Sequence, residues 1–70
     1  MPFVTIRLVK EAIAADPAGK KDRIAKAVAT ALSEAMGLPK DEVWTVFDEV
    51  NARDWYLGET EVETRRFKKK

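Results

Sequence analysis

The sequence contains neither cysteine nor histidine, and these absences remove several kinds of chemistry. Without cysteine there is no disulfide, no thiol nucleophile and no thiolate metal ligand. Without histidine there is no imidazole base, so a proton moved near neutral pH has to pass through a carboxyl group, an amine or the chain terminus. We expect no metal site and no cofactor.

Glycine and long apolar runs are also scarce. The three glycines, Gly19, Gly37 and Gly58, are too widely spaced for a phosphate-binding loop. The longest uncharged stretch is far shorter than the roughly 20 residues that cross a bilayer, and no cationic segment precedes the N-terminal apolar run. We therefore expect a cytoplasmic protein that has no membrane partner.

The net charge is only +1, but the charges are unevenly distributed along the chain. Five of the 13 lysines and arginines lie in the last six residues, whereas all 12 acidic residues lie before them. A nucleic-acid-binding domain needs a basic face, and residues 1–64 are acidic overall. We expect no nucleic acid partner, and we divide the chain into a domain of residues 1–64 and a solvated basic tail of residues 65–70.

Two segments favour β-strands, and the segment between them favours a helix. Residues 2–9 and 43–50 are rich in β-branched and aromatic residues. From Ile24 to Met36 the apolar residues recur at helical spacing. Because two strands joined by a crossover helix usually run parallel, the order predicts a β-α-β unit.

The ends of the predicted helix carry specific signals. Asp16 followed by Pro17 is typical of a helix start, and Gly37 followed by Pro39 is typical of a helix end. Farther along, residues 55–62 suggest two short extended pieces around a glycine, a hairpin too small to be stable alone. The expected fold class is α/β (α+β): one β-α-β unit with parallel strands plus a short C-terminal hairpin.

Assembly follows from this small architecture. A two-stranded sheet covered by one helix leaves its other face and both edges open. A domain of this size also buries only about 60% of the surface of its unfolded chain. We therefore expect a homo-oligomer, with dimers that assemble further.

Several features together resemble the 4-oxalocrotonate tautomerase family, and the similarity covers nearly the whole chain. They are the opening Met1-Pro2, the strand at residues 2–6, the lysines Lys20 and Lys21 near the helix start, Pro39 after the helix, the strand at residues 43–49, and the aromatic-glycine flap at residues 55–58. Members of this family form dimers that assemble as hexamers. The resemblance implies a cofactor-independent homohexamer built as a trimer of dimers, with a dimer or trimer as alternatives.

The resemblance also implies a catalytic residue, Pro2, exposed by removal of Met1. A terminal proline is a secondary amine, and a free α-amino group already titrates near pH 8. Burial beside cations disfavours the ammonium form and lowers this pKa, which suits a general base at neutral pH. A proline that merely fits the first position of a strand is the alternative interpretation.

The implied reaction is a keto-enol isomerisation of a small anionic enol or 2-oxo acid, with the Pro2 amine as general base. Two alternatives stay open. A protonated Pro2 could act as an acid in hydration, dehalogenation or decarboxylation of unsaturated acids. If Met1 is retained, the Pro2 nitrogen is an uncharged amide and the chain is a non-catalytic oligomeric protein.

Three further residues are candidates for binding the substrate. The family's arginine after the first strand has no counterpart in residues 10–15, and its arginine in the second strand aligns with Trp44. Arg53, just before the flap, could bind a carboxylate through its bidentate guanidinium, or could be a surface residue. Trp55 matches an aromatic pocket wall, and Trp44 could line the pocket. Both tryptophans could instead be subunit contacts.

Overall fold

A computed structural model describes residues 2–67. None of the helices in this range is long and apolar enough to cross a membrane. The described elements are, in chain order, β1 (Phe3–Val9), the helical turn η1 (Lys10–Ile13), α1 (Pro17–Met36), the turn η2 (Lys40–Glu42), β2 (Trp44–Val50), the turn η3 (Ala52–Asp54), β3 (Tyr56–Leu57), β4 (Thr60–Glu61) and the terminal helical turn η4 (Glu63–Phe67).

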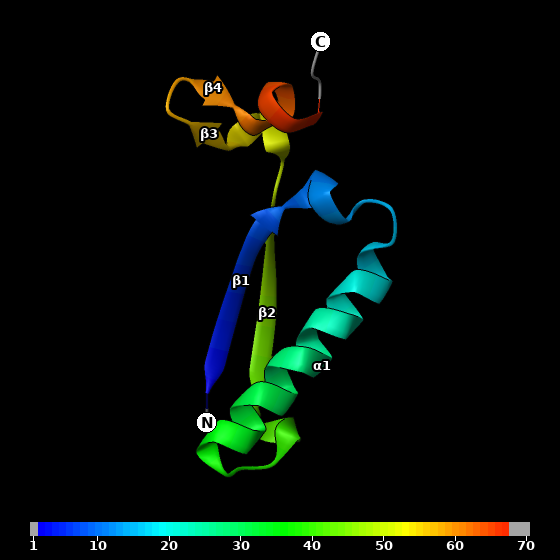
Figure 1. Ribbon diagram of the computed structural model, residues 1–70, viewed down its shortest axis with the longest axis vertical. Coiled ribbons are helices and arrows are strands. Elements are labelled where there is room, and N and C mark those ends of the chain that lie inside the picture. The colour runs from blue at the N-terminus through cyan, green and yellow to red at the C-terminus, as the bar shows by residue number, and fades with distance from the viewer. Residues whose placement is uncertain (1, 68–70) are drawn as a thin grey trace.

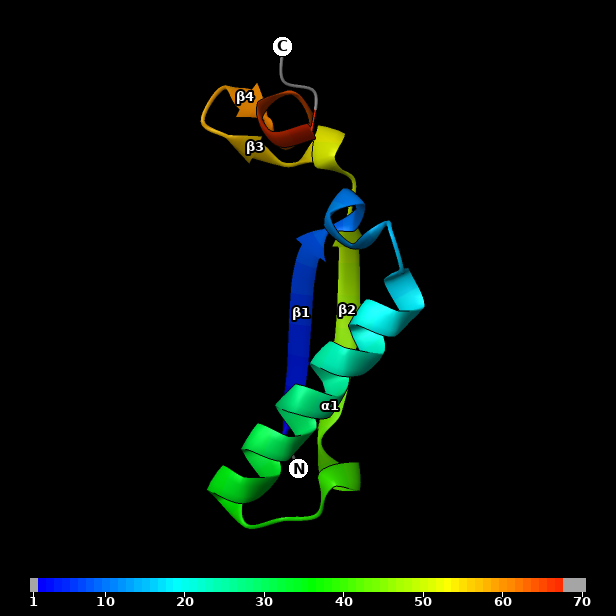
Figure 2. The same ribbon diagram turned by 45° about the vertical axis from the view of Figure 1, so that its right-hand side comes forward.

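The predicted fold class is confirmed. Strands β1 and β2 are parallel, with Phe3 opposite Trp44 and Val9 opposite Val50. Helix α1 packs on one face of this sheet (Figures 1 and 2). Strands β3 and β4 form the expected antiparallel hairpin, which lies with η3 and η4 beyond the carboxyl ends of β1 and β2.

Both ends of α1 form as the sequence predicts. The Asp16 carboxylate accepts a hydrogen bond from the Gly19 amide at 3.2 Å, which satisfies a donor of the first turn. At the other end Gly37 has a φ of 67°, and its amide donates to the Ser33 carbonyl at 2.9 Å. Only glycine adopts this left-handed conformation without a steric penalty, so the helix ends there.

The most deeply buried side chains gather at the hairpin end rather than between helix and sheet. Ile13, Ala52 and Val62 are the buried hydrophobic residues of the described chain. By contrast, α1 has no buried residue, and its apolar stripe is half-covered at positions such as Val28 and exposed at Met36. The helix and sheet therefore form an incompletely closed layer.

The open face of the sheet is apolar near the amino ends of the strands and carries the Arg7–Asp48 ion pair farther along. Phe3, Trp44 and Val46 lie on the side away from α1 and are 63%, 54% and 45% exposed. The accessible surface of 5168 Å² exceeds the about 4,400 Å² expected of a compact chain of this mass. The radius of gyration, 15.0 Å, likewise exceeds the about 11 Å of a compact 70-residue domain. One copy alone is thus elongated and under-packed.

The beginning of the basic tail has a defined conformation. Arg65 and Arg66 belong to η4, the turn that follows β4. Residues 68–70, which carry the three terminal lysines, lie outside the described residues.

Candidate functional site

Pro2 and Trp44 lie together at the amino ends of the two strands. The Trp44 amide donates to the Pro2 carbonyl at 3.1 Å, which fixes Pro2 beside the first residue of β2. Pro2 is half-buried, whereas the Trp44 side chain is largely exposed. The turn η2, which contains the acidic residues Asp41 and Glu42, precedes β2 and so lies at this end of the sheet.

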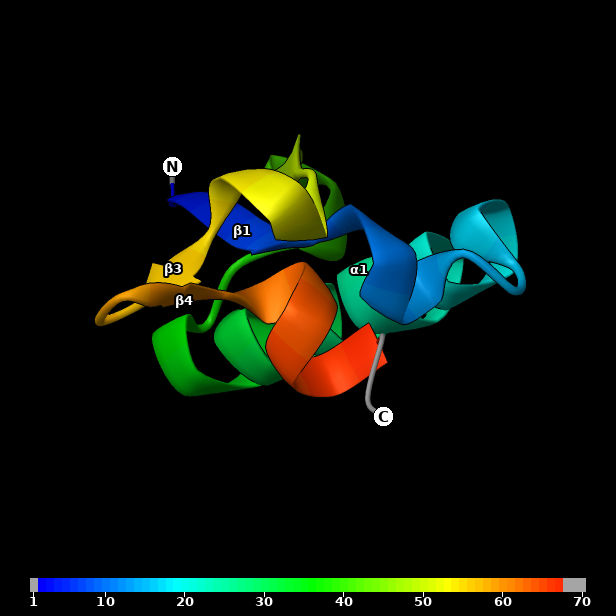
Figure 3. The ribbon, with the colours of Figure 1, turned by 90° about the horizontal axis from the view of Figure 1, so that it is seen from above.

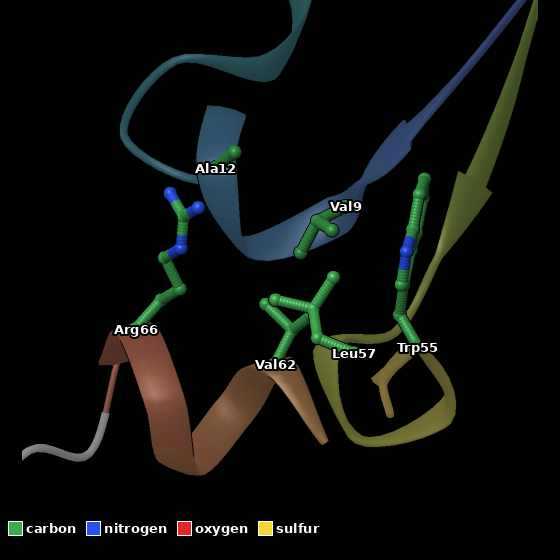
Figure 4. Close-up of a pocket in the computed structure, with 6 residues that line it drawn as sticks. All are labelled: Val9, Ala12, Trp55, Leu57, Val62 and Arg66. Carbon is green, nitrogen blue, oxygen red and sulfur yellow. The ribbon is translucent and has the colours of Figure 1, made fainter. Parts of the chain in front are cut away.

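A hollow of about 300 Å³ lies at the opposite end, between the end of β1 and the hairpin (Figure 4). The residues that line it are Val9, Ala12, Trp55, Leu57, Val62 and Arg66. The Val62 amide donates to the Trp55 carbonyl at 2.7 Å and so closes the base of the hairpin. In Figure 4 the Arg66 side chain and the Trp55 indole stand on opposite sides of the apolar side chains.

Arg53 lies on the flap and interacts with its neighbours there. Its guanidinium Nη1 donates to the Tyr56 hydroxyl at 3.0 Å and lies 3.5 Å from Glu61 Oε1. The hydrogen bond to Tyr56, aided by the charges of Tyr56 and Glu61, raises the pKa of the Arg53 guanidinium above its ordinary value. Arg53 therefore carries a permanent positive charge, already partly balanced, next to the residues that line the hollow rather than among them.

Within one chain the four residues predicted for the site form two groups. Pro2 and Trp44 make one group, and Arg53 and Trp55 make the other. The seven residues of β1 separate the groups by roughly 20 Å, at about 3.3 Å per residue. Figure 3 looks along the long axis from the hairpin end, so the hairpin and η4 lie nearer the viewer than the sheet.

Of the six described residues that line the hollow, the sequence predicted only Trp55 as a site residue, and the charged one, Arg66, was assigned to the tail. A signal was present in the spacing. Arg66 follows the apolar Val62 by four residues, which places both on the same side of a helical turn. A cation and a buried valine on one face indicate a turn that packs against the domain rather than a solvated end.

These observations define a class of protein: a small β-α-β chain with an N-terminal proline at one end of its sheet and an apolar hollow at the other. Residues 2–65 match the family described as "Tautomerase enzyme", and the chain belongs to this family. The resemblance found in the sequence is thereby confirmed. Family and fold support a function within the tautomerase superfamily and an enzyme of the isomerase type.

A solved structure supports the same fold. The chain is similar to the crystal structure of DmpI from Helicobacter pylori, with a TM-score of 0.66 and 22% sequence identity, over 89% of this chain and 91% of that chain. A search of curated proteins gave no match.

Proposed function

We propose that this protein is an isomerase that catalyses keto-enol proton transfer on a small anionic enol or 2-oxo acid, with the Pro2 amine as general base. Pro2 takes a proton from the enol hydroxyl, and the same amine returns a proton to the carbon that becomes saturated. Trp44 lines the site beside Pro2, and Trp55 and Arg53 contribute from the hairpin end.

The observation that carries this proposal is the position of Pro2. The match to the tautomerase family begins at residue 2, and Pro2 is held at the sheet end by the hydrogen bond from Trp44. In a chain without histidine, a terminal secondary amine is the group whose pKa lies nearest to neutral pH. Burial of Pro2 in an assembled site would favour its uncharged, basic form.

A complete site requires a second copy of the chain. Pro2 and the hollow of one copy are too far apart to act on one small molecule. Antiparallel pairing of two copies along a free strand edge would place the Pro2 end of one sheet beside the hairpin end of the other. We propose such dimers, assembled further into a hexamer, as the active form.

A second reaction class follows if acidic groups keep Pro2 protonated. The turn η2, which contains Lys40 as well as Asp41 and Glu42, precedes β2 at the end where Pro2 lies, and a carboxylate close to an ammonium group stabilises it. A Pro2 that stays protonated would act as a general acid in hydration, dehalogenation or decarboxylation of an unsaturated acid.

The test starts with the intact mass of the purified protein, because the Pro2 nitrogen is basic only after Met1 has been removed. Ketonisation of phenylenolpyruvate and of 2-hydroxymuconate is then measured for the processed wild type and for Pro2→Ala. If the secondary amine of Pro2 is the base, its replacement by the primary amine of alanine predicts a fall in kcat of about 10²-fold or more. Alanine keeps a terminal primary amine, so Pro2→Ala separates the role of the secondary amine from that of a free terminus.

Two outcomes would reject the proposal. Equal rates of wild type and Pro2→Ala would exclude a requirement for the secondary amine of Pro2. A chain that retains Met1 in its natural host would leave a non-catalytic assembly. Hydration of an unsaturated acid without ketonisation would instead support Pro2 as a general acid.

A further inference from the structure

Arg66 lines the hollow and, unlike Arg7 and Arg53, has no acidic partner among residues 2–67. Arg7 pairs with Asp48 at 2.8 Å, and Arg53 lies 3.5 Å from Glu61. Among residues 2–67 no hydrogen bond or ion pair engages the Arg66 guanidinium. Its charge is therefore available to a ligand.

The surroundings of Arg66 restrict what that ligand can be. Every other side chain that lines the hollow is hydrophobic: Val9, Ala12, Trp55, Leu57 and Val62. Figure 4 shows these side chains grouped beside the long Arg66 side chain. The hollow thus offers one cation at its edge and apolar contacts inside.

We propose that Arg66 binds the carboxylate of the substrate and that the substrate is a monocarboxylate with an apolar body, such as an aryl or alkyl 2-oxo acid. This inference rests on the proposed function. A guanidinium pairs with one carboxylate through two parallel hydrogen bonds. The second carboxylate of a dicarboxylic acid would lie among valine and leucine side chains without a partner, which disfavours its binding.

The volume of the hollow agrees with this assignment. At about 300 Å³ it lies at the lower end of the range of small-molecule sites. A single aromatic ring with a short carboxylate chain matches a site of this size, and the ring can stack on the Trp55 indole.

The test is a binding measurement that needs no turnover. Isothermal titration calorimetry of the assembled protein compares 3-phenylpropanoate with its neutral analogue 3-phenylpropanamide and with the dicarboxylate adipate. Wild type, Arg66→Gln and Arg65→Gln are compared. Arg65 is the matched control, because it lies in the same turn, carries the same charge and does not line the hollow.

We expect Arg66→Gln to weaken 3-phenylpropanoate binding about tenfold or more, the loss of a charge-assisted hydrogen bond. Arg65→Gln should leave this binding unchanged. Binding of 3-phenylpropanamide should be equal in wild type and Arg66→Gln, which would also show that the variant keeps an intact hollow. Adipate should bind the wild type more weakly than 3-phenylpropanoate.

Equal weakening in the two variants, tighter binding of adipate, or no saturable binding of 3-phenylpropanoate would each overturn the inference. The binding assay tests this inference and the turnover assay tests the proposed reaction, so the two can fail independently. If 3-phenylpropanoate binding depends on Arg66 but Pro2→Ala ketonises as fast as wild type, the hollow is a monocarboxylate site and the proposed base is wrong.

Discussion

At the scale of single residues, the proposed chemistry depends on an amine and an arginine with opposite requirements. The Pro2 amine has to lose its proton to act as a base, so it needs a dry position with few acidic neighbours. A carboxylate-binding arginine has to keep its charge unbalanced until the substrate arrives. Arg53 is already close to Glu61, whereas Arg66 has no acidic partner among the described residues. The two arginines should therefore contribute unequally to substrate binding.

Arg53→Ala tests this difference. Because the charge of Arg53 is exposed and partly balanced by Glu61, we expect the KM for phenylenolpyruvate to rise only a few-fold, with kcat nearly unchanged. Arg66→Gln should raise the same KM about tenfold. Steady-state kinetics of the two variants at equal ionic strength measures both effects. A larger loss in Arg53→Ala would identify Arg53 as the main carboxylate ligand.

At the scale of elements, the hairpin end is held by one contact between segments far apart in the sequence. The Glu11 carboxylate of η1 accepts a hydrogen bond from the Ala52 amide of η3 at 2.8 Å. Ala52 is fully buried, so no water molecule can take the place of the Glu11 carboxylate as the acceptor for its amide. The contact joins the end of β1 to the turn before Trp55 and thereby fixes two walls of the hollow, Val9 and Trp55.

Substitution of Glu11 should therefore affect stability more than its exposed position suggests. Glu11→Ala leaves the Ala52 amide without an acceptor and should lower the free energy of unfolding by about 2 kcal/mol. Glu11→Gln keeps a neutral acceptor and should cost about 1 kcal/mol or less. Urea denaturation at fixed protein concentration measures both variants.

Glu34→Ala is the control for that series, since Glu34 is exposed on α1 and should change stability by no more than about 0.5 kcal/mol. If Glu11→Ala unfolds at the same urea concentration as Glu34→Ala, the carboxylate does not hold the two turns together.

At the scale of the whole molecule, the sequence predicts features that depend on neighbouring residues and fails for contacts between residues far apart in the chain. The strands and α1 follow from alternation and helical spacing, and the helix ends follow from Asp16 and Gly37, all of which are local signals. The hydrogen bond between Glu11 and Ala52 joins residues 41 positions apart, and no local sequence pattern predicts it. Arg66 has a local signal in its spacing from Val62, but its position on the hollow depends on how the chain turns back after β4.

The exposed sheet face provides the last prediction, because it is the surface through which the proposed dimers would assemble further. The accessible surface exceeds that of a compact chain by roughly 750 Å², close to the about 800 Å² that one partner contributes to a standard interface. In an isolated chain Val46→Asp would cost little, since Val46 is 45% exposed. In an assembly that covers this face, the new carboxylate would be buried without a partner and the subunits should separate.

We therefore expect Val46→Asp to sediment as a smaller species than the wild type and to lose ketonisation activity with its assembly. Ala18→Asp introduces the same charge at an exposed position in the first turn of α1, where it is favourable, and should keep the wild-type sedimentation. Activity measured over a range of protein concentrations links the two effects, because mass action should restore part of the activity of Val46→Asp at high concentration. A Val46→Asp protein that assembles like the wild type would place the contact between dimers on another surface. A smaller but fully active species would mean that the site is complete without the contact across the sheet face.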